Sequence, residues 1–259
     1  MDLGISGRKA IVCASSRGLG KGCALALAEA GCELVVNGRD ETALRHTSDE
    51  IEAISGKAPH IVVADIGTPG GRRAVLDACP EPDILINNNG GPPMKDFREL
   101  DHEAMIAGIE QNMITPIEMI QAVIDGMAER GFGRIVNITS MSVLSPIQGL
   151  DLSSGARAGL TAFLAGVCRQ FADRNVTINN MLPGKMDTDR LRGGFAYRSK
   201  LSGKPVEEVA DALAAQIPAK RFGTLEEFGR ICAFLCSDHA GYLTGQNMRV
   251  DGGLFAAAF

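Results

Sequence analysis

Short runs of aliphatic and β-branched residues recur along the chain and alternate with segments in which apolar residues follow the helical period. Each run is typical of a strand buried on both faces. Alternating strands and helices predict parallel strands joined by right-handed crossovers, which gives an α/β, doubly wound sheet of about seven strands with helices on both faces. The predicted strands are residues 9–14, 33–36, 60–64, 83–87, 134–139, 176–182 and 247–250, and the predicted helices are 18–29, 41–54, 103–129, 156–172 and 225–236.

One stretch interrupts this alternation. Residues 189–217 are polar, contain glycines and follow a helical pattern without a strand. Such a segment is typical of a lid over the carboxyl ends of the strands. No repeat or linker divides the chain, so we expect a single domain over residues 1–259 with the lid within it.

Composition limits the possible partners. The formal net charge of −5 and the lack of a basic stripe argue against nucleic acid. No apolar run approaches the ~20 residues of a membrane span, so we expect no membrane contact and a cytoplasmic location. The seven cysteines are scattered among apolar residues, which indicates buried, reduced thiols and no metal site.

The first predicted strand runs into a glycine-containing turn and then into a helix. Glycines at 18 and 20 let backbone N–H groups approach a pyrophosphate at the positive end of that helix. In a βαβ unit, this pattern predicts a Rossmann-like dinucleotide site. Its residues are Ser15, Ser16, Arg17, Gly18, Leu19 and Gly20.

The end of the second predicted strand indicates which dinucleotide is bound. A site selective for NAD(H) would have a carboxylate where Arg39 stands. Arg39 and Arg17 could together bind a 2′-phosphate, because guanidinium groups bind phosphate in bidentate geometry. NADP(H) is therefore favoured. NAD(H) stays open, with both arginines solvated and Asp40 as the ribose ligand.

Taken together, these motifs resemble the short-chain dehydrogenase/reductase family, and the chain is similar to 3-oxoacyl-[acyl-carrier-protein] reductases. The resemblance implies that Asp65 and Ile66 lie on the adenine side, and that Asn88, Asn89 and Gly90 shape the adenosine-ribose side. It places Pro183, Gly184 and Thr188 beside the nicotinamide, and it implies a homotetramer or homodimer. The matching segments are residues 65–66, 87–90, 112, 135–140, 179–188, 221–223, 242–246 and 250–253.

Two of the four catalytic residue types of that family are present in this chain. The family uses an asparagine, a serine, a tyrosine and a lysine, of which Asn112 and Ser140 match. Ser153 stands at the tyrosine position and Arg157 at the lysine position. An aliphatic alcohol is far more basic than a phenol of pKa about 10 and is shorter. Arg157 keeps a positive charge that could hold ribose hydroxyls or an anionic substrate.

Two other residues are candidate proton donors. Tyr197 lies in the predicted lid, where closure could bring its hydroxyl over the nicotinamide, although lid aromatics often only exclude water. Lys185 follows the Pro183-Gly184 turn and is otherwise a solvated lysine.

Three functions are compatible with this pattern. The first is an NADP(H)-dependent oxidoreductase acting on a small-molecule carbonyl/alcohol pair, with a 3-oxoacyl thioester as one candidate and with non-standard proton delivery. The second is a catalytically impaired pseudoenzyme or sensor that binds NADP(H). The third is non-redox chemistry in which Arg157 stabilises an enolate.

Overall fold

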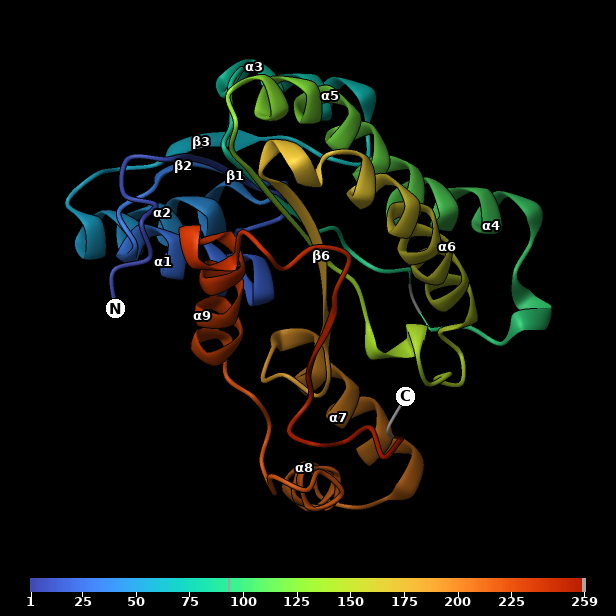
Figure 1. Ribbon diagram of the computed structural model, residues 1–259. Coiled ribbons are helices and arrows are strands. Elements are labelled where there is room, and N and C mark those ends of the chain that lie inside the picture. Colours follow the sequence, from blue (N-terminus) through green and yellow to red (C-terminus); the bar gives the residue numbers. More distant parts are fainter. Residues whose placement is uncertain (93, 258–259) are drawn as a thin grey trace.

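The computed structural model describes residues 1–92 and 94–257, without the side chains of Tyr197 and Leu201. Its centre is a seven-stranded parallel sheet in the order β3-β2-β1-β4-β5-β6-β7, which confirms the predicted fold class (Figure 1). The strands are β1 (Lys9–Val12), β2 (Glu33–Gly38), β3 (His60–Val63), β4 (Ile84–Asn87), β5 (Gly133–Ile138), β6 (Val176–Pro183) and β7 (Asn247–Val250).

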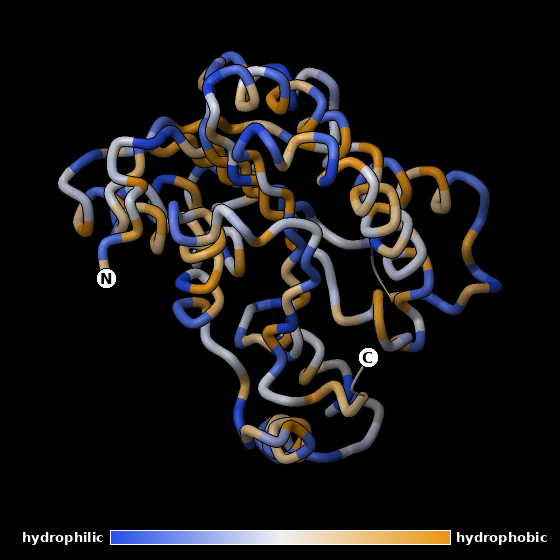
Figure 2. Tube along the Cα trace, in the orientation of Figure 1, coloured by the Kyte–Doolittle hydropathy of each residue, from blue (hydrophilic) through white to orange (hydrophobic). Residues whose placement is uncertain are grey.

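Helices cover both faces of the sheet (Figure 1). On one side lie α1 (Gly18–Glu29), α2 (Glu41–Ser55) and α9 (Leu225–Cys236), and on the other lie α3 (Pro69–Ala78), α5 (Thr115–Glu129) and α6 (Asp151–Val167). Successive residues of one strand enter opposite cores, since Val12 packs with the α1 side and Ile11 with the α5 side. Apolar segments accordingly gather around the sheet (Figure 2).

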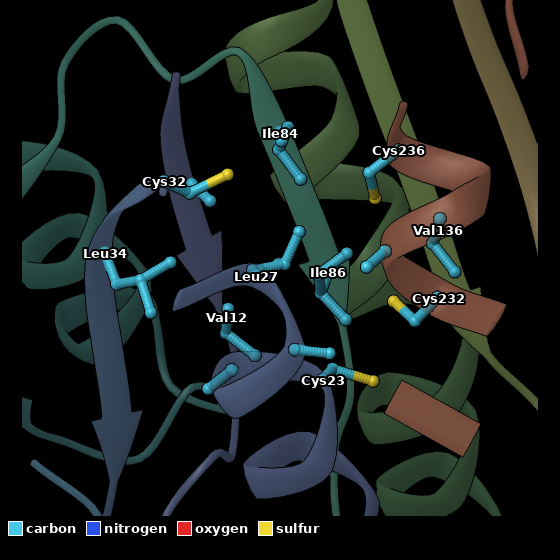
Figure 3. Close-up of a cluster of buried hydrophobic side chains, with 14 of the residues drawn as sticks. Val12, Cys23, Leu27, Cys32, Leu34, Ile84, Ile86, Val136, Cys232 and Cys236 are labelled. Carbon is cyan, nitrogen blue, oxygen red and sulfur yellow. The ribbon is translucent and has the colours of Figure 1, made fainter. Parts of the chain in front are cut away.

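The core beneath α1 and α9 contains four of the cysteines, Cys23, Cys32, Cys232 and Cys236 (Figure 3). Cys23, Cys232 and Cys236 lie there among aliphatic side chains such as Leu27 and Ile86. All seven cysteines are buried and free. A hydrogen bond with Cys23, together with burial, raises the pKa of the Cys232 thiol well above normal, and burial does the same for Cys236. These groups therefore act as small apolar side chains and not as nucleophiles.

The edge strands differ from the prediction. Residues 60–64 and 247–250 were expected to be buried on both faces, but β3 and β7 are the two edges of the sheet and are only partly buried. Val63, for example, is 47% exposed. A strand run can be apolar in sequence and still lack a neighbour on one side, which composition does not reveal.

The predicted long helix at 103–129 is interrupted. It consists of α4 (His102–Ile109), a π-helical turn (Glu110–Ile114) and α5. Pro116 explains the interruption, because it has no N–H to donate to the carbonyl of Asn112 and its ring crowds that carbonyl. The N–H of Thr115 bonds instead to the carbonyl of Glu110, five residues earlier. Helix α3 was not predicted, although Thr68 caps it and Pro69 opens it.

A row of asparagine side chains crosses four neighbouring strands. Asn87 donates from Nδ2 to Oδ1 of Asn137 at 3.0 Å, and Asn137 donates to Asn180 at 3.1 Å. Asn180 then donates to Asn247 at 2.9 Å. Each pair is also in register between adjacent strands. We call these four residues the asparagine ladder; its first three members are buried.

Beyond β6, the chain forms α7 (Asp189–Ser202) and α8 (Val206–Ala215) at the carboxyl end of the sheet (Figure 1). Phe195, Val209 and Leu213 form a small core between these helices. The ring of Phe195 stacks on that of Phe222, with the ring centroids 5.4 Å apart. These helices lie in the predicted lid, which the structure finds helical and without a strand. Among the described residues, no helix is long and apolar enough to cross a membrane.

The asparagine ladder should contribute measurably to stability. Asn137→Leu removes the hydrogen bonds of this side chain with Asn87, Asn180 and the carbonyl of Asn179, and it leaves Oδ1 of Asn180 buried without a donor. We therefore expect a loss of roughly 2–4 kcal/mol in the free energy of unfolding. Urea denaturation followed by circular dichroism measures this. Asn247→Ala, at the exposed end, is the matched control and should cost less than about 1 kcal/mol. Equal losses in the two variants would show that the buried amides are not mutually dependent.

Candidate active site

The predicted site residues lie at one edge of the sheet because all seven strands are parallel. Their carboxyl ends point the same way, and the order turns in opposite directions from β1, towards β2 on one side and β4 on the other. Loops leaving β1 and β4 therefore separate and leave a crevice between them, which is where dinucleotides bind in doubly wound sheets.

The backbone of the loop between β1 and α1 is open to close approach by an anion. Gly18 has φ +59° and begins α1, and the helix has no side-chain cap at Arg17. The first N–H groups of α1 thus have no side-chain cap, and they lie at the positive end of the helix dipole. A Cβ at Gly20 would overlap the carbonyl oxygen of Ala14 and lie 2.8 Å from Nδ2 of Asn88, which donates to that same carbonyl at 3.1 Å.

Other side chains of this loop support it from beneath. The hydroxyl of Ser15 is fully buried, donates to the carbonyl of Val12 at 2.8 Å and accepts from the N–H of Asn37 at 3.1 Å. Leu19 packs on the core. Ser16 lies against Gly38, where a Cβ would be 2.9 Å from that of Ser16. Within the predicted phosphate loop, the side chains of Ser15 and Leu19 therefore position the backbone.

The two predicted arginines of the 2′-phosphate clamp lie in the turns that follow β1 and β2, and each is paired with a carboxylate. Arg17 pairs with Asp40, and Arg39 lies 3.6 Å from Asp65 with 77% of its side chain exposed. Asp40 also accepts from the N–H of Ala43 and caps α2, which is the main reason its pKa is lowered. Exposed ion pairs of this kind are weak, so an incoming phosphate can replace the carboxylates.

Asn112 lies in the π-helical turn and is buried. Its Nδ2 donates to the carbonyl of Gly108 at 3.3 Å, and its Oδ1 has no hydrogen-bond partner. Pro116 also leaves the backbone carbonyl of Asn112 without its usual helical donor. Unpaired acceptors are rare in protein interiors, and π-turns often mark functional sites.

Ser153 and Arg157 lie one turn apart on α6 and contact each other. Arg157 donates from Nε to Oγ of Ser153 at 3.1 Å. Its Nη1 donates to the carbonyls of Ile138 and Thr139, at 2.7 and 3.0 Å, at the end of β5. Burial, with a smaller effect of the nearby Arg190 guanidinium, lowers the pKa of Arg157 to about 10. The arginine therefore remains charged near neutral pH and is tied to the strand that carries Ser140.

Ser140 follows Thr139 directly. Its Oγ accepts from the N–H of Ser142 at 3.1 Å and caps the short 3-10 helix Met141–Val143. Because this bond uses an acceptor lone pair, the hydroxyl proton is free to be donated.

A small cavity connects the asparagines and Arg157. Its volume is about 20 Å³, room for roughly one water molecule. Five predicted site residues line it. Ser153 bonds to Arg157, and Ser140 follows Thr139, whose carbonyl Arg157 also contacts. Sequence reasoning did not single out Gln111, Thr115 or Asn137, of which only Asn137 lay in a recognisable motif. The predicted residues that line the cavity are Ile66, Asn88, Asn89, Asn112 and Arg157.

The loop after β6 faces the phosphate loop. A Cβ at Gly18 would lie 3.9 Å from Cγ2 of Thr188, whose hydroxyl caps α7 by accepting from Leu191 at 3.2 Å. Pro183 ends β6, and Gly184 packs against the backbone of Asp251. Thr188 therefore faces Gly18 across the turn, and its place beside the nicotinamide stays a prediction.

Lys185 and Tyr197 are the two alternative proton donors. Lys185 donates from Nζ to Oε1 of Gln216 at 3.2 Å, and partial burial lowers its pKa. Tyr197 lies in α7, but its side chain is outside the part of the chain that the structure describes. Its proposed role stays a prediction.

Known proteins resemble this chain over almost its entire length. A family model described as enoyl-(acyl carrier protein) reductase matches residues 13–255. The NADPH-dependent reductase BacG of Bacillus subtilis is 32% identical over 254 residues, covering 96% of this chain and 98% of that protein. The 3-oxoacyl-[acyl-carrier-protein] reductase FabG of Vibrio cholerae is 30% identical over 257 residues, covering 98% and 99%.

A solved structure agrees with these relatives. L-Sorbose reductase from Gluconobacter frateurii, in complex with NADPH and L-sorbose, superposes with a TM-score of 0.93 and 27% identity. The match covers 99% of this chain and 100% of that one.

The close contact at Gly20 gives a test of the loop geometry. Gly20→Ala places a methyl group against the carbonyl of Ala14 and the amide of Asn88, so we expect a loss of about 1–3 kcal/mol in unfolding free energy. The matched control is Gly166→Ala, inside α6 with open space around the new methyl, which should gain up to about 1 kcal/mol. Thermal or urea unfolding measures the stability of both variants. An unchanged unfolding free energy in Gly20→Ala would contradict the described contact.

Proposed function

The chain belongs to the short-chain dehydrogenase/reductase family, and from this premise we propose that it is an NADP(H)-dependent reductase interconverting a carbonyl compound and its alcohol. The observation that carries the proposal is the crevice itself. An uncapped helix N-terminus and a side-chain-free backbone at Gly18 and Gly20 adjoin Asn88, and Asn88 lines one cavity with the buried charge of Arg157. The printed names of BacG and of the sorbose reductase complex, which both specify NADPH, support the choice of cofactor.

The residues of the crevice fit a phosphorylated dinucleotide. The N–H groups at the start of α1 would hold the pyrophosphate, because no side chain competes for them. Arg17 and Arg39 would exchange Asp40 and Asp65 for the 2′-phosphate. Asp40 is already engaged as the cap of α2, which supports NADP(H) over NAD(H).

The side chains of the site would orient and polarise the carbonyl group. When bound, the reduced nicotinamide supplies a hydride to the carbonyl carbon. Ser140 has a free hydroxyl proton with which to hold the carbonyl oxygen, and Arg157 stabilises the negative charge that develops there. Such fixed charges act strongly in a site shielded from water.

Proton delivery would differ from that of a tyrosine-dependent reductase. Oγ of Ser153 accepts from Nε of Arg157, so its own proton is available for the substrate oxygen. The hydroxyl would be reprotonated by water, and the cavity beside Oδ1 of Asn112 has room for one molecule. Arg157 lowers the cost of negative charge on Ser153 during this exchange.

Three finer features belong to the same proposal. A 3-oxoacyl thioester is one candidate substrate, in keeping with the printed name of the Vibrio cholerae relative. Helices α7 and α8, within residues 189–217, would act as a lid on the single domain. Assembly into a homotetramer or homodimer is supported by exposed apolar side chains on α4 and α6, among them Ile106, Ile109 and Phe163.

A second function is favoured by the contacts of the catalytic pair. Ser153 is buried and bonded to Arg157, whose own donors reach two backbone carbonyls. A pair committed to internal contacts could leave the carbonyl oxygen without an acid. The chain would then bind NADP(H) without turnover, as a sensor or structural partner.

The cofactor preference can be tested at the two arginines. The double variant Arg17→Ala/Arg39→Ala should weaken NADPH binding about tenfold or more and change NADH binding little, because only the 2′-phosphate contact is lost. Isothermal titration calorimetry measures both dissociation constants. Arg45→Ala, an exposed arginine paired with Glu41 on α2, is the control. An equal loss for NADH and NADPH would contradict a 2′-phosphate clamp.

The catalytic pair separates the two functions. If the chain is a reductase, it oxidises NADPH with simple ketones, and Ser153→Ala lowers kcat by about 10²-fold or more while leaving NADPH affinity unchanged. Ser154→Ala is the control, since that hydroxyl only bonds to the carbonyl of Leu150. If the unaltered chain binds NADPH without turnover and Ser153→Tyr/Arg157→Lys creates activity, the sensor function replaces the reductase.

A further inference from the structure

Arg157 is a buried cation without a complete set of partners. Arg134 is the useful comparison, because it is also buried and without a carboxylate partner. All three nitrogens of Arg134 donate to carbonyl groups, and its guanidinium stacks on Phe132. Among the described residues, Arg157 donates only from Nε and Nη1, and Nη2 contacts no acceptor. Nη2 is therefore the part of this guanidinium that is available to a ligand.

A second arginine contacts the loop that follows Asn89. Arg190, in the first turn of α7, donates from Nη2 to the carbonyl of Pro92 at 3.3 Å. Its guanidinium lies against Gly91, where a Cβ would be 2.7 Å from Nη1. Gly91 follows two residues after Asn89, which lines the cavity with Arg157. Arg190 therefore borders the same region from the α7 side.

The two cations are not neutralised. Most arginines of the chain pair with a carboxylate, but within the described part neither Arg157 nor Arg190 forms an ion pair. Arg190 is also close enough to contribute to the lowered pKa of Arg157, which reflects repulsion between them. Like charges disfavour each other, so an anion bound between the two guanidinium groups would be stabilised by both.

We propose that the substrate carries a carboxylate close to its reacting carbonyl group and that this carboxylate binds between Arg157 and Arg190. The inference rests on the proposed reductase function and adds the substrate class. Arg157 bonds to the carbonyl of Thr139, directly before Ser140, so the carboxylate lies only a short distance from the carbonyl that Ser140 orients. The geometry therefore points to 2-oxo and 3-oxo acids, and to the corresponding hydroxy acids in the reverse direction.

The arrangement gives the two arginines different tasks. Arg157 is fixed by two backbone carbonyls and supplies a pre-oriented donor. Arg190 is exposed and has one long bond to a backbone carbonyl, so it can turn towards a carboxylate at little cost. Arg190 can bind a carboxylate in bidentate geometry, and Nη2 of Arg157 adds a single bond, which favours an acid over its ester or amide.

Binding measurements test the inference without requiring turnover. The protein saturated with NADP⁺ is titrated by calorimetry with acetoacetate and with acetoacetamide, and with pyruvate and its methyl ester. We expect each acid to bind about 10- to 100-fold more tightly than its neutral partner, with an affinity that falls as salt is added. Arg190→Gln should remove most of that preference. Lys200→Gln, a charge of the same helix, should keep it.

Turnover measurements separate this inference from the reductase function. In NADPH oxidation assays, the acids should show lower KM values than their neutral partners and than L-sorbose, and Arg190→Gln should raise KM for the acids alone. Absence of turnover with tighter acid binding overturns the reductase and leaves the anion site. Equal binding of acids and neutral partners overturns the anion site. The anion site is also overturned if Arg190→Gln loses NADPH affinity while the acid preference stays intact. A preference for phosphate-bearing 3-oxoacyl-coenzyme A thioesters over free acids overturns it as well.

Discussion

The asparagine ladder fixes strands β4 to β7 relative to one another, and the site is built on the carboxyl edge of these strands. A sheet of aliphatic strands has little to specify register near its end, because one apolar pair packs much like the next. Buried amides are different, since each must meet its partner or remain unsatisfied. Asn87, Asn137 and Asn180 therefore align the strand ends from which Asn88, Ser140 and Pro183 continue.

Arg157 extends this alignment from the sheet to the helix layer. Its bonds to the last carbonyls of β5 join α6 to the strand that leads into Ser140, and its bond to Ser153 fixes the serine on the same helix face. A lysine at this position would offer a single flexible ammonium group. The planar guanidinium can instead hold two carbonyls and a hydroxyl while directing its remaining nitrogen elsewhere.

The sequence was sufficient for the sheet, its approximate strand positions and the phosphate loop, because these depend on local periodicity and on glycines at required positions. Features that depend on neighbours distant in sequence were not accessible. Periodicity could not show that β3 and β7 would be edges, that Pro116 would open a π-turn at Asn112, or that four asparagines would meet. Likewise, the exchange of tyrosine and lysine for Ser153 and Arg157 was visible, but their mutual bond and the approach of Arg190 required coordinates.

The pKa of about 10 for Arg157 also sets how the pocket responds to acidity. Sites that hold their ligands with histidine change charge within the physiological range. The guanidinium of Arg157 stays ionised throughout that range even though burial has weakened its hold on the proton. Its attraction for a bound anion is thus nearly constant between mildly acidic and mildly alkaline surroundings, and any acid–base sensitivity of ligand capture would originate in the ligand or in other groups.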